Sequence, residues 1–370
     1  MRIRLSKPYF GDKQSLMDFI EDVLDRGFLV QGKYVSQFEE QVADFLGVRN
    51  GIAVSSGTAA LHLSLVVLGI GPGDEVVVPA YTFPATANVV ELVGAKPVLV
   101  DVDLETFNID PDRMIEVISP KTKAIIPVHL FGNPAEMDRI CKISKTYGLK
   151  VIEDAAGAMG SKYKGRSCGS IGTLGCFSFH PRKIITTGEG GMVVTDDDRL
   201  AERIRSLRNH GVQPRGSEYD FVLAGFNYRL NELEAALGIS QMDGIQMRID
   251  ERRRLAEHYM DLLKSIPGIS FQKTLPGTMT TWQAFVIRSQ KKDNHSILDW
   301  LQKEGIEATV GTYAIHLLRY YRGKYHYTPS NYPNAARLYL STMALPFYNR
   351  MPRKKIQQVV EALREVRDEN

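Results

Sequence analysis

The chain has 370 residues, 44% of them hydrophobic and 24% charged, which are ordinary values for a globular protein and exclude a disordered or fibrous one. At roughly 150 residues per domain, this length predicts about two domains. The 46 basic and 43 acidic residues leave a net charge of only +3, with no block of like charges. A nucleic acid is therefore not expected as a partner.

Cysteine and histidine usage indicates neither a disulfide framework nor a metal site. The three cysteines, Cys141, Cys168 and Cys176, are odd in number and form no CxxC pair, and none of the eight histidines lies in an HExxH motif. The first residues lack the apolar core of a signal peptide, and no apolar stretch reaches the ~20 residues that a membrane span needs. We therefore expect a cytoplasmic protein with reduced cysteines, no metal and no membrane partner.

Short β-branched runs alternate with segments of helical period from Gly51 onward, which is typical of an α/β fold with a mostly parallel sheet and helices on both faces. The runs are almost continuously apolar, as strands covered on both sides must be. The predicted strands are Ile52–Ser55, Glu75–Val78, Pro97–Asp101, Ala124–Val128, Lys150–Glu153, Cys176–Phe179 and Met192–Thr195. The predicted helices between them are Thr58–Leu68, Phe83–Leu92, Pro111–Ile118, Ala135–Tyr147 and Asp198–Asn209.

The pattern changes toward the C-terminus, where one long charged helix, Gly244–Leu263, is followed by short strand-like pieces and a closing helix, Lys354–Arg367. We place a domain boundary near Met242–Ile249. Residues 1–245 are predicted to form a large α/β domain, and residues 246–370 a smaller C-terminal α+β domain.

Ligands of an open α/β sheet bind beyond the carboxyl ends of its strands, so the residues that follow each predicted strand are the first candidates for a site. Ser56-Gly57-Thr58 follows the first strand and opens a helix, which suits a phosphate but is also an ordinary helix N-cap. Phe83 follows the second strand and either stacks on a flat ring or belongs to the core. Asp154 ends an apolar run, where an acid is costly unless it faces a positive group.

Lys183 lies between an apolar strand and a glycine-rich turn, with His180 and Arg182 close in sequence. Such a setting lowers a lysine pKa and makes the amine nucleophilic, although an isolated lysine is usually a solvated surface residue. A phosphate cradle, a stacking aromatic, an acid for a ring nitrogen and a lysine for a Schiff base are together what pyridoxal 5′-phosphate (PLP) requires.

Ordered motifs along nearly the whole chain resemble the DegT/DnrJ/EryC1/StrS family of PLP-dependent nucleotide-sugar aminotransferases. They include Gly32 near the start, SSGTAALHL, GIGPGDEVVVPAYTF, VIEDAAGAMGS, FSFHPRKIITTGEGGMVVT and NYRLNELEAALG. The resemblance implies the type I fold of PLP enzymes, which is that of aspartate aminotransferase. It also implies Lys183 as the catalytic Schiff-base lysine, and Gly57, Thr58, Phe83, Asp154, Ser178 and Asn227 as further cofactor contacts.

The same resemblance implies a homodimer with shared sites, because the family's asparagine at Asn227 reaches the phosphate bound by the neighbouring subunit. The alternative for Asn227 is a turn residue before the helix at Asn231–Leu237. Two positions depart from the family's pattern. Gly157 stands where many members have Gln or Glu near the cofactor's phenolic oxygen, so water, another side chain or the substrate can be that oxygen's partner. Met159 replaces a common histidine, so substrate preference is not inferred from those relatives.

Transfer of an amino group from L-glutamate to a keto sugar on a nucleotide diphosphate is the activity that the resemblance implies, with PLP passing through its pyridoxamine form. FHPRK followed by ITTGEGG resembles the family members that act on 4-keto sugars more than those that act on 3-keto sugars, which implies a 4-keto sugar, in amino-sugar, polysaccharide or glycan biosynthesis. The residues expected on the substrate side are His180, Arg229, Tyr313 and His316. Six of the 16 tyrosines lie in Gly311–Tyr332 with several cations, which suits either a nucleotide-sugar pocket or a domain or subunit interface.

Three rival functions are less well supported by the residues. A PLP- or PMP-dependent sugar dehydratase of this family would have histidine in place of Lys183. A non-catalytic regulator with the same fold has no need of Lys183, Asp154 and Ser178 together. A nicotinamide dehydrogenase would show G-x-G-x-x-G after the first strand, where this chain has Ser-Gly-Thr.

Overall fold

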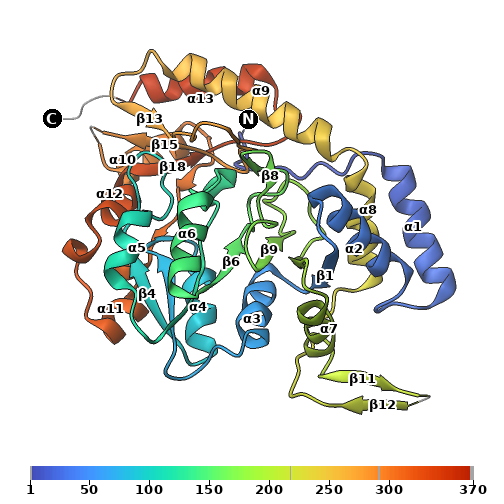
Figure 1. The fold of residues 1–370 in the computed structure, drawn as a ribbon. Coiled ribbons are helices and arrows are strands. Elements are labelled where there is room, and N and C mark those ends of the chain that lie inside the picture. Colours follow the sequence, from blue (N-terminus) through green and yellow to red (C-terminus); the bar gives the residue numbers. More distant parts are fainter. Residues whose placement is uncertain (1, 217, 291, 367–370) are drawn as a thin grey trace.

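The computed structural model describes residues 2–216, 218–290 and 292–366. Its centre is a seven-stranded sheet in the order β1-β10-β9-β6-β5-β2-β4 (Figure 1). Strand β10 pairs antiparallel with β1 and β9, and every other neighbouring pair is parallel. The strands are β1 (Asn50–Val54), β2 (Glu75–Pro79), β4 (Lys96–Val100), β5 (Thr122–Ile125), β6 (Lys150–Asp154), β9 (Leu174–Ser178) and β10 (Gly191–Thr195). All seven predicted strands are present, within a few residues of their predicted ends.

Helices cover both faces of this sheet, because successive residues of each strand point to opposite sides. Val76 and Val78 lie in one core with α3 (Gly57–Val67), α4 (Ala85–Leu92) and α7 (Asp198–Leu207). Val77 lies in another core with α5 (Pro111–Val117) and α6 (Met137–Tyr147). The second face continues over β1, β9 and β10 under α2 (Lys33–Leu46) and α8 (Glu232–Met242). The predicted α/β class is confirmed.

A smaller antiparallel sheet lies toward the C-terminus, in the order β13-β15-β18-β16. Its core includes residues of three helices, which lie beside it in Figure 1. These elements are β13 (Ile269–Phe271), β15 (Phe285–Ser289), β16 (Thr309–Val310), β18 (Thr342–Leu345), α9 (Ile245–Leu263), α10 (Asn294–Lys303) and α13 (Arg353–Arg364). Ile3 bridges Ile306 and is buried in the same core, so residues near the N-terminus join this unit. The exact division near residue 245 stays a prediction.

Several elements have no counterpart among the predictions. They include two helices, α1 (Lys13–Arg26) and α2, before the first strand, and a hairpin that projects from the body in Figure 1. Others are short pairs at the sheet's margins. The remaining elements are β3 (Tyr81–Thr82), β7 (Lys162–Tyr163), β8 (Arg166–Ser167), β11 (Val212–Arg215), β12 (Glu218–Phe221), β14 (Thr278–Met279), β17 (Tyr313–Ala314), α11 (Arg319–Tyr325) and α12 (Pro333–Ser341), with 3-10 turns at Leu130–Gly132, Ile315–Leu317 and Pro329–Asn331.

The start of α2 depends on a residue distant in sequence. The buried Glu232 carboxylate of α8 accepts N–H bonds from Gly32, Tyr34 and Val35 at 3.0, 2.9 and 2.9 Å. A Cβ at Gly32 would lie only 2.7 Å from Glu232 Oε2. Glycine at this position therefore lets a carboxylate of α8 close the end of a helix, where free N–H groups need an acceptor.

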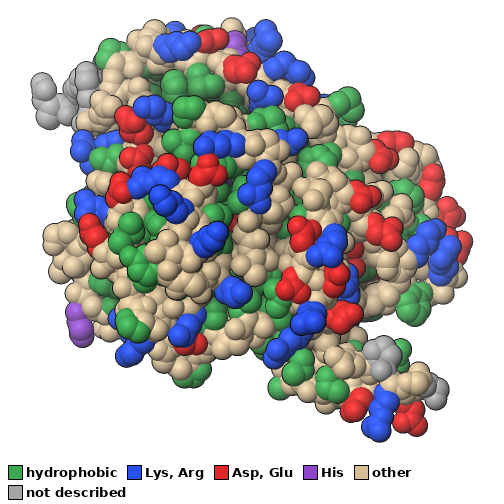
Figure 2. Space-filling model, viewed as in Figure 1, with side chains coloured by type: hydrophobic (Ala, Val, Ile, Leu, Met, Phe, Trp, Pro, Cys, Tyr) green, Lys and Arg blue, Asp and Glu red, His purple; other side chains and the backbone are tan. Residues whose placement is uncertain are grey.

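Positive and negative side chains are interspersed over the face shown in Figure 2, without a large patch of one sign. No helix within the described ranges is long and apolar enough to cross a bilayer. Cys141, Cys168 and Cys176 are all free.

Candidate active site

A cavity of about 520 Å³ opens at the carboxyl ends of the strands of the large sheet. Most of the predicted site residues meet there although they are far apart in sequence. Its lining includes Gly57, Thr58, Phe83, Asp154, Ser178, His180 and Lys183. The segments that the strand-end rule selects from the sequence therefore meet in one cavity.

One wall of the cavity is the N-terminus of α3. The Ser56 hydroxyl caps this helix by accepting the N–H of Ala59 at 3.0 Å. The N–H groups of Gly57 and Thr58 have no acceptor within the part of the chain that the structure describes. A Cβ at Gly57 would lie 2.8 Å from the Cβ of Ser178, so the glycine brings the helix end against the Ser178 strand. Free N–H groups, a helix dipole and a hydroxyl fit a phosphate.

Asp154 is the last residue of β6 and is only 6% exposed. Its carboxylate accepts the Thr86 hydroxyl at 2.8 Å and the N–H of Ala156 at 3.2 Å. Burial raises the pKa of Asp154, while these two bonds and the charge of Lys183 act in the opposite direction. A buried acid of this kind favours a cation beside it, and a protonated ring nitrogen fits that requirement.

Lys183 follows β9 in a turn, where its N–H donates to the carbonyl of His180 at 2.8 Å. Burial lowers the pKa of Lys183; Asp154 opposes this effect, and the positive charge of Arg182 adds to it. Burial also lowers the pKa of His180. A lysine with a lowered pKa has more neutral amine at physiological pH, which is the form that attacks a carbonyl carbon.

Phe83 lies at the rim of the cavity and is 62% exposed. Its ring makes an edge contact with Tyr313, with centroids 6.3 Å apart. Of the two interpretations of Phe83, core packing is excluded by this exposure. The open ring face is available to stack on a planar ligand.

Four predicted residues do not line the cavity. Asn227 is exposed and forms a bridge with Asn209, whose side-chain oxygen accepts Arg229 Nη1 at 2.7 Å. Tyr313 does not line the cavity, although Gly311 and Thr312, just before it in the sequence, do.

His316 is completely buried against Tyr332, and neither ring nitrogen has a hydrogen-bond partner in the described structure. Burial lowers the pKa of His316 to about 4. The roles of these residues stay predictions.

The tyrosine-rich segment fits the interface alternative better than the nucleotide pocket. Tyr321 donates its hydroxyl to Asn88 at 2.7 Å, and Tyr325 donates to Glu91 at 2.7 Å. Asn88 and Glu91 belong to α4, and Lys324 also pairs with Glu91. These contacts attach α11 to the large sheet's helical layer rather than opening a pocket.

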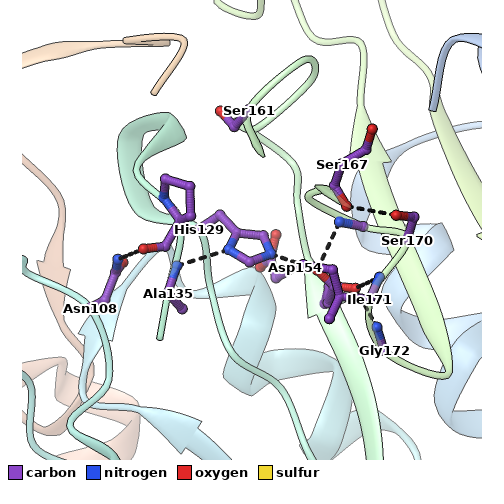
Figure 3. Close-up of polar contacts among 12 residues, drawn as sticks. Asn108, His129, Ala135, Asp154, Ser161, Ser167, Ser170, Ile171 and Gly172 are labelled. Carbon is purple, nitrogen blue, oxygen red and sulfur yellow. Dashed lines mark hydrogen bonds and ion pairs between the residues drawn. The ribbon is translucent and has the colours of Figure 1, made fainter. Parts of the chain in front are cut away.

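A buried His129–Glu153 pair beside the cavity was not predicted. His129 follows β5 and lines the cavity, and its Nε2 lies 2.8 Å from Glu153 Oε2. Glu153 also accepts the N–H groups of Gly169, Ile171 and Gly172 at 2.8, 2.6 and 2.5 Å. Figure 3 shows His129 between Ala135 and the loop that contains Ile171 and Gly172. The sequence does contain a signal for this pair, because His129 follows a predicted strand and Glu153 ends another, directly before Asp154.

Burial lowers the pKa of His129, but contacts with Cys168 and Glu153 outweigh it and raise the pKa to about 10, which favours a second ring proton. We assign the singly protonated ring instead, because a backbone N–H faces Nδ1 and leaves no room for a proton there. Nδ1 of His129 accepts the N–H of Ala135 at 3.0 Å, so it carries a lone pair, and the ring proton is on Nε2. The Nε2–H group then donates to Glu153, whose four partners are all donors and thus require the carboxylate form. The N–H of His129 also donates to the carbonyl of Asp154 at 3.1 Å. The pair therefore fixes the backbone that presents Asp154.

A second hollow, of about 630 Å³, lies at the opposite end of β1 and β10. Its acidic residues already have partners: the N–H of Arg49 donates to Asp196 at 2.9 Å, and Arg49 and Asn50 bind Asp198 at 3.2 and 2.8 Å. It has none of the nucleophilic or buried acidic groups that mark the first cavity.

Comparison with known proteins agrees with this geometry. Residues 12–364 match the DegT/DnrJ/EryC1/StrS aminotransferase family. GDP-perosamine synthase of Caulobacter vibrioides is 38% identical over 371 residues, which cover 99% of this chain and 98% of that protein. DesV of S. venezuelae, solved with a ketimine intermediate, has a TM-score of 0.91 and 33% identity over 98% of each chain.

Spr1654 of Streptococcus pneumoniae, solved in its PMP form, has a TM-score of 0.93 and 27% identity, covering 99% of this chain and 98% of that one. The residues of the present cavity fit the same cofactor, since a free helix N-terminus, a buried acid that favours a cation and a lysine with a lowered pKa meet in one space. The chain belongs to the DegT/DnrJ/EryC1/StrS aminotransferase family and is a PLP-dependent sugar aminotransferase.

Proposed function

We propose that this enzyme moves the amino group of L-glutamate to the keto group of a nucleotide-linked 4-keto sugar, for amino-sugar, polysaccharide or glycan biosynthesis. The observation that carries the proposal is the meeting of Lys183, Asp154 and the α3 N-terminus in one cavity. The similarity to GDP-perosamine synthase, which is named for a nucleotide-linked sugar, supports a substrate of that class.

The residues of the cavity take distinct roles in this proposal. The N–H groups of Gly57 and Thr58 and the hydroxyl of Ser178 would bind the cofactor phosphate, and Phe83 would stack on the ring. Asp154 would pair with the ring nitrogen and keep it protonated. The bound cofactor supplies an electron sink for the carbon that loses its proton.

Lys183 has two tasks. Its Nζ would hold the cofactor covalently, and as a free amine the same Nζ would accept a proton and return it. The lowered pKa of Lys183 supports both tasks, because a neutral amine is required for attack and for accepting a proton.

The substrate-binding residues are proposed mainly from where they lie relative to the cavity. His180 lines the cavity next to Lys183, which supports a contact with substrate. Arg229, Tyr313 and His316 are kept as candidates although none of them lines the cavity; Tyr313 contacts the lining residue Phe83.

A homodimer is also part of the proposal. Asn227 is exposed close to the end of β1, since the N–H of Ser55 donates to the carbonyl of Tyr228 at 2.9 Å. Tyr219 and Phe221 on the projecting hairpin are 74% and 65% exposed, which is typical of a surface that another chain covers.

We also propose a cytoplasmic location. The three free cysteines support a reducing, cytoplasmic setting.

The test is an assay of both halves of the reaction. PLP-loaded enzyme is incubated with L-glutamate alone and then with a panel of nucleotide keto sugars, and the products are analysed by mass spectrometry. We expect 2-oxoglutarate in an amount equal to the enzyme without acceptor, and continuous release with a 4-keto sugar. Loss of a sugar hydroxyl without 2-oxoglutarate would indicate a dehydratase, and no reaction with any acceptor would favour a regulator.

A further inference from the structure

Gln283 lies in the cavity wall at the position that Gly157 leaves open. A Cβ built on Gly157 would lie 3.0 Å from Gln283 Oε1 and 3.5 Å from its Cγ. The φ of Gly157 is not in the left-handed region, so the backbone there does not itself require glycine. The space beside residue 157 is thus filled by a polar side chain that comes from just before β15.

The backbone at Gln283 is held from three sides. The N–H of Gln283 donates to the carbonyl of Phe131 at 2.9 Å. The buried Arg252 donates from Nε to the carbonyl of Trp282 at 3.0 Å and from Nη2 to the carbonyl of Gln283 at 2.6 Å. Trp282 has a φ of 51°, a left-handed conformation that is unfavourable for a residue with a side chain. Such a conformation persists where its surroundings enforce it, and it is concentrated at functional sites.

The Gln283 amide reaches residues 182–186, the turn that carries Lys183 and is called the catalytic turn below. Its Nε2 donates to the carbonyl of Arg182 at 2.9 Å, which belongs to the peptide group preceding Lys183. An amide nitrogen has two N–H groups, so one donor is left for an acceptor in the cavity.

We propose that Gln283 replaces the polar side chain missing at position 157 and donates a hydrogen bond to the phenolic oxygen of the bound cofactor. The inference depends on the proposed placement of PLP in this cavity. A donor on that oxygen draws negative charge from it, and this weakens the hold on the proton of the nearby imine nitrogen. Gln283 is therefore a cofactor contact as well as a support for Lys183.

The experiment moves the amide from one position to the other. The variants are Gln283→Ala, Gly157→Gln, and the two combined. Gln241→Ala is the matched control, because Gln241 also binds the catalytic turn, at Thr186 with Nε2–O 2.7 Å, but does not line the cavity. For each protein, the dissociation constant of PLP, the pH midpoint of the bound cofactor's absorption change, and the Tm of the cofactor-free form are measured.

We expect Gln283→Ala to weaken PLP binding about 10-fold and to raise the pH midpoint by about half a unit or more, as loss of one hydrogen bond to a charged group would. The combined variant should recover most of both changes. Gln241→Ala should lower Tm and leave the midpoint unchanged. An unchanged midpoint in Gln283→Ala, or no recovery in the combined variant, would overturn the inference. Wild-type protein that does not bind PLP would instead refute the proposed function.

Discussion

The effect of Glu153→Gln on stability can be worked out from the hydrogen bonds of the buried pair. Oε1 of Glu153 accepts two N–H groups and Oε2 accepts His129 and a third N–H group. An amide nitrogen at either position faces two donors. His129 cannot compensate by moving its proton to Nδ1, because Nδ1 would then face the N–H of Ala135. Two buried donors lose their acceptor, at about 1–3 kcal/mol each.

We therefore expect Glu153→Gln to lower the free energy of unfolding by about 2–6 kcal/mol. Urea denaturation of the cofactor-free protein followed by circular dichroism measures this quantity. The control is Glu105→Gln, whose partner Lys273 is an exposed surface residue, and which should change stability by less than about 1 kcal/mol. A loss below about 1 kcal/mol in Glu153→Gln would refute the assigned tautomer and the carboxylate form of Glu153.

The further predictions concern three titratable residues. Lys183→Ala should reduce transamination by at least about 10³-fold in steady-state assays, since covalent attachment and proton transfer both depend on its amine, and activity within ~10-fold of wild type would reject this role. Asp154→Asn should reduce turnover by about 10²-fold. Because burial raises the pKa of Asp154, the unfolding free energy of cofactor-free wild type should fall as pH rises above 3.8 toward the raised value, and the Asn variant should lack this fall. Because the pKa of His316 is lowered to about 4, the unfolding free energy of wild type should fall as pH falls from 6.5 to 4, and His316→Leu should lack this fall. Unfolding free energies from urea denaturation that change with pH in the same way in both proteins would contradict this.

The large sheet was predictable because its strands are apolar on both faces and alternate with amphipathic helices. The helix predicted to start at Phe83 begins at Ala85, because Pro84 occupies the N-cap. The N-terminal helices were not predicted, although α1 and α2 both end at a left-handed glycine, Gly27 and Gly47. The hairpin of β11 and β12 is exposed along β12, so it has no buried face to give it a two-residue period.

The sequence could predict those cavity residues that each follow a single recognisable strand. Lys183, Asp154 and Phe83 each follow a strand whose pattern is clear. His129 and Glu153 follow the same rule, but their partnership depends on backbone groups of a loop that no local pattern marks. Gln283 lies more than a hundred residues from Gly157, so its position could come only from the packing of the two sheets.

Borohydride reduction of the PLP-loaded enzyme, followed by mass spectrometry of its peptides, tests the central claim most directly. Reduction makes the link between lysine and cofactor permanent, so the modified residue can be identified. The account predicts a phosphopyridoxyl group on Lys183 in wild type and none in Lys183→Ala. No modification, or modification at a different lysine only, would contradict it.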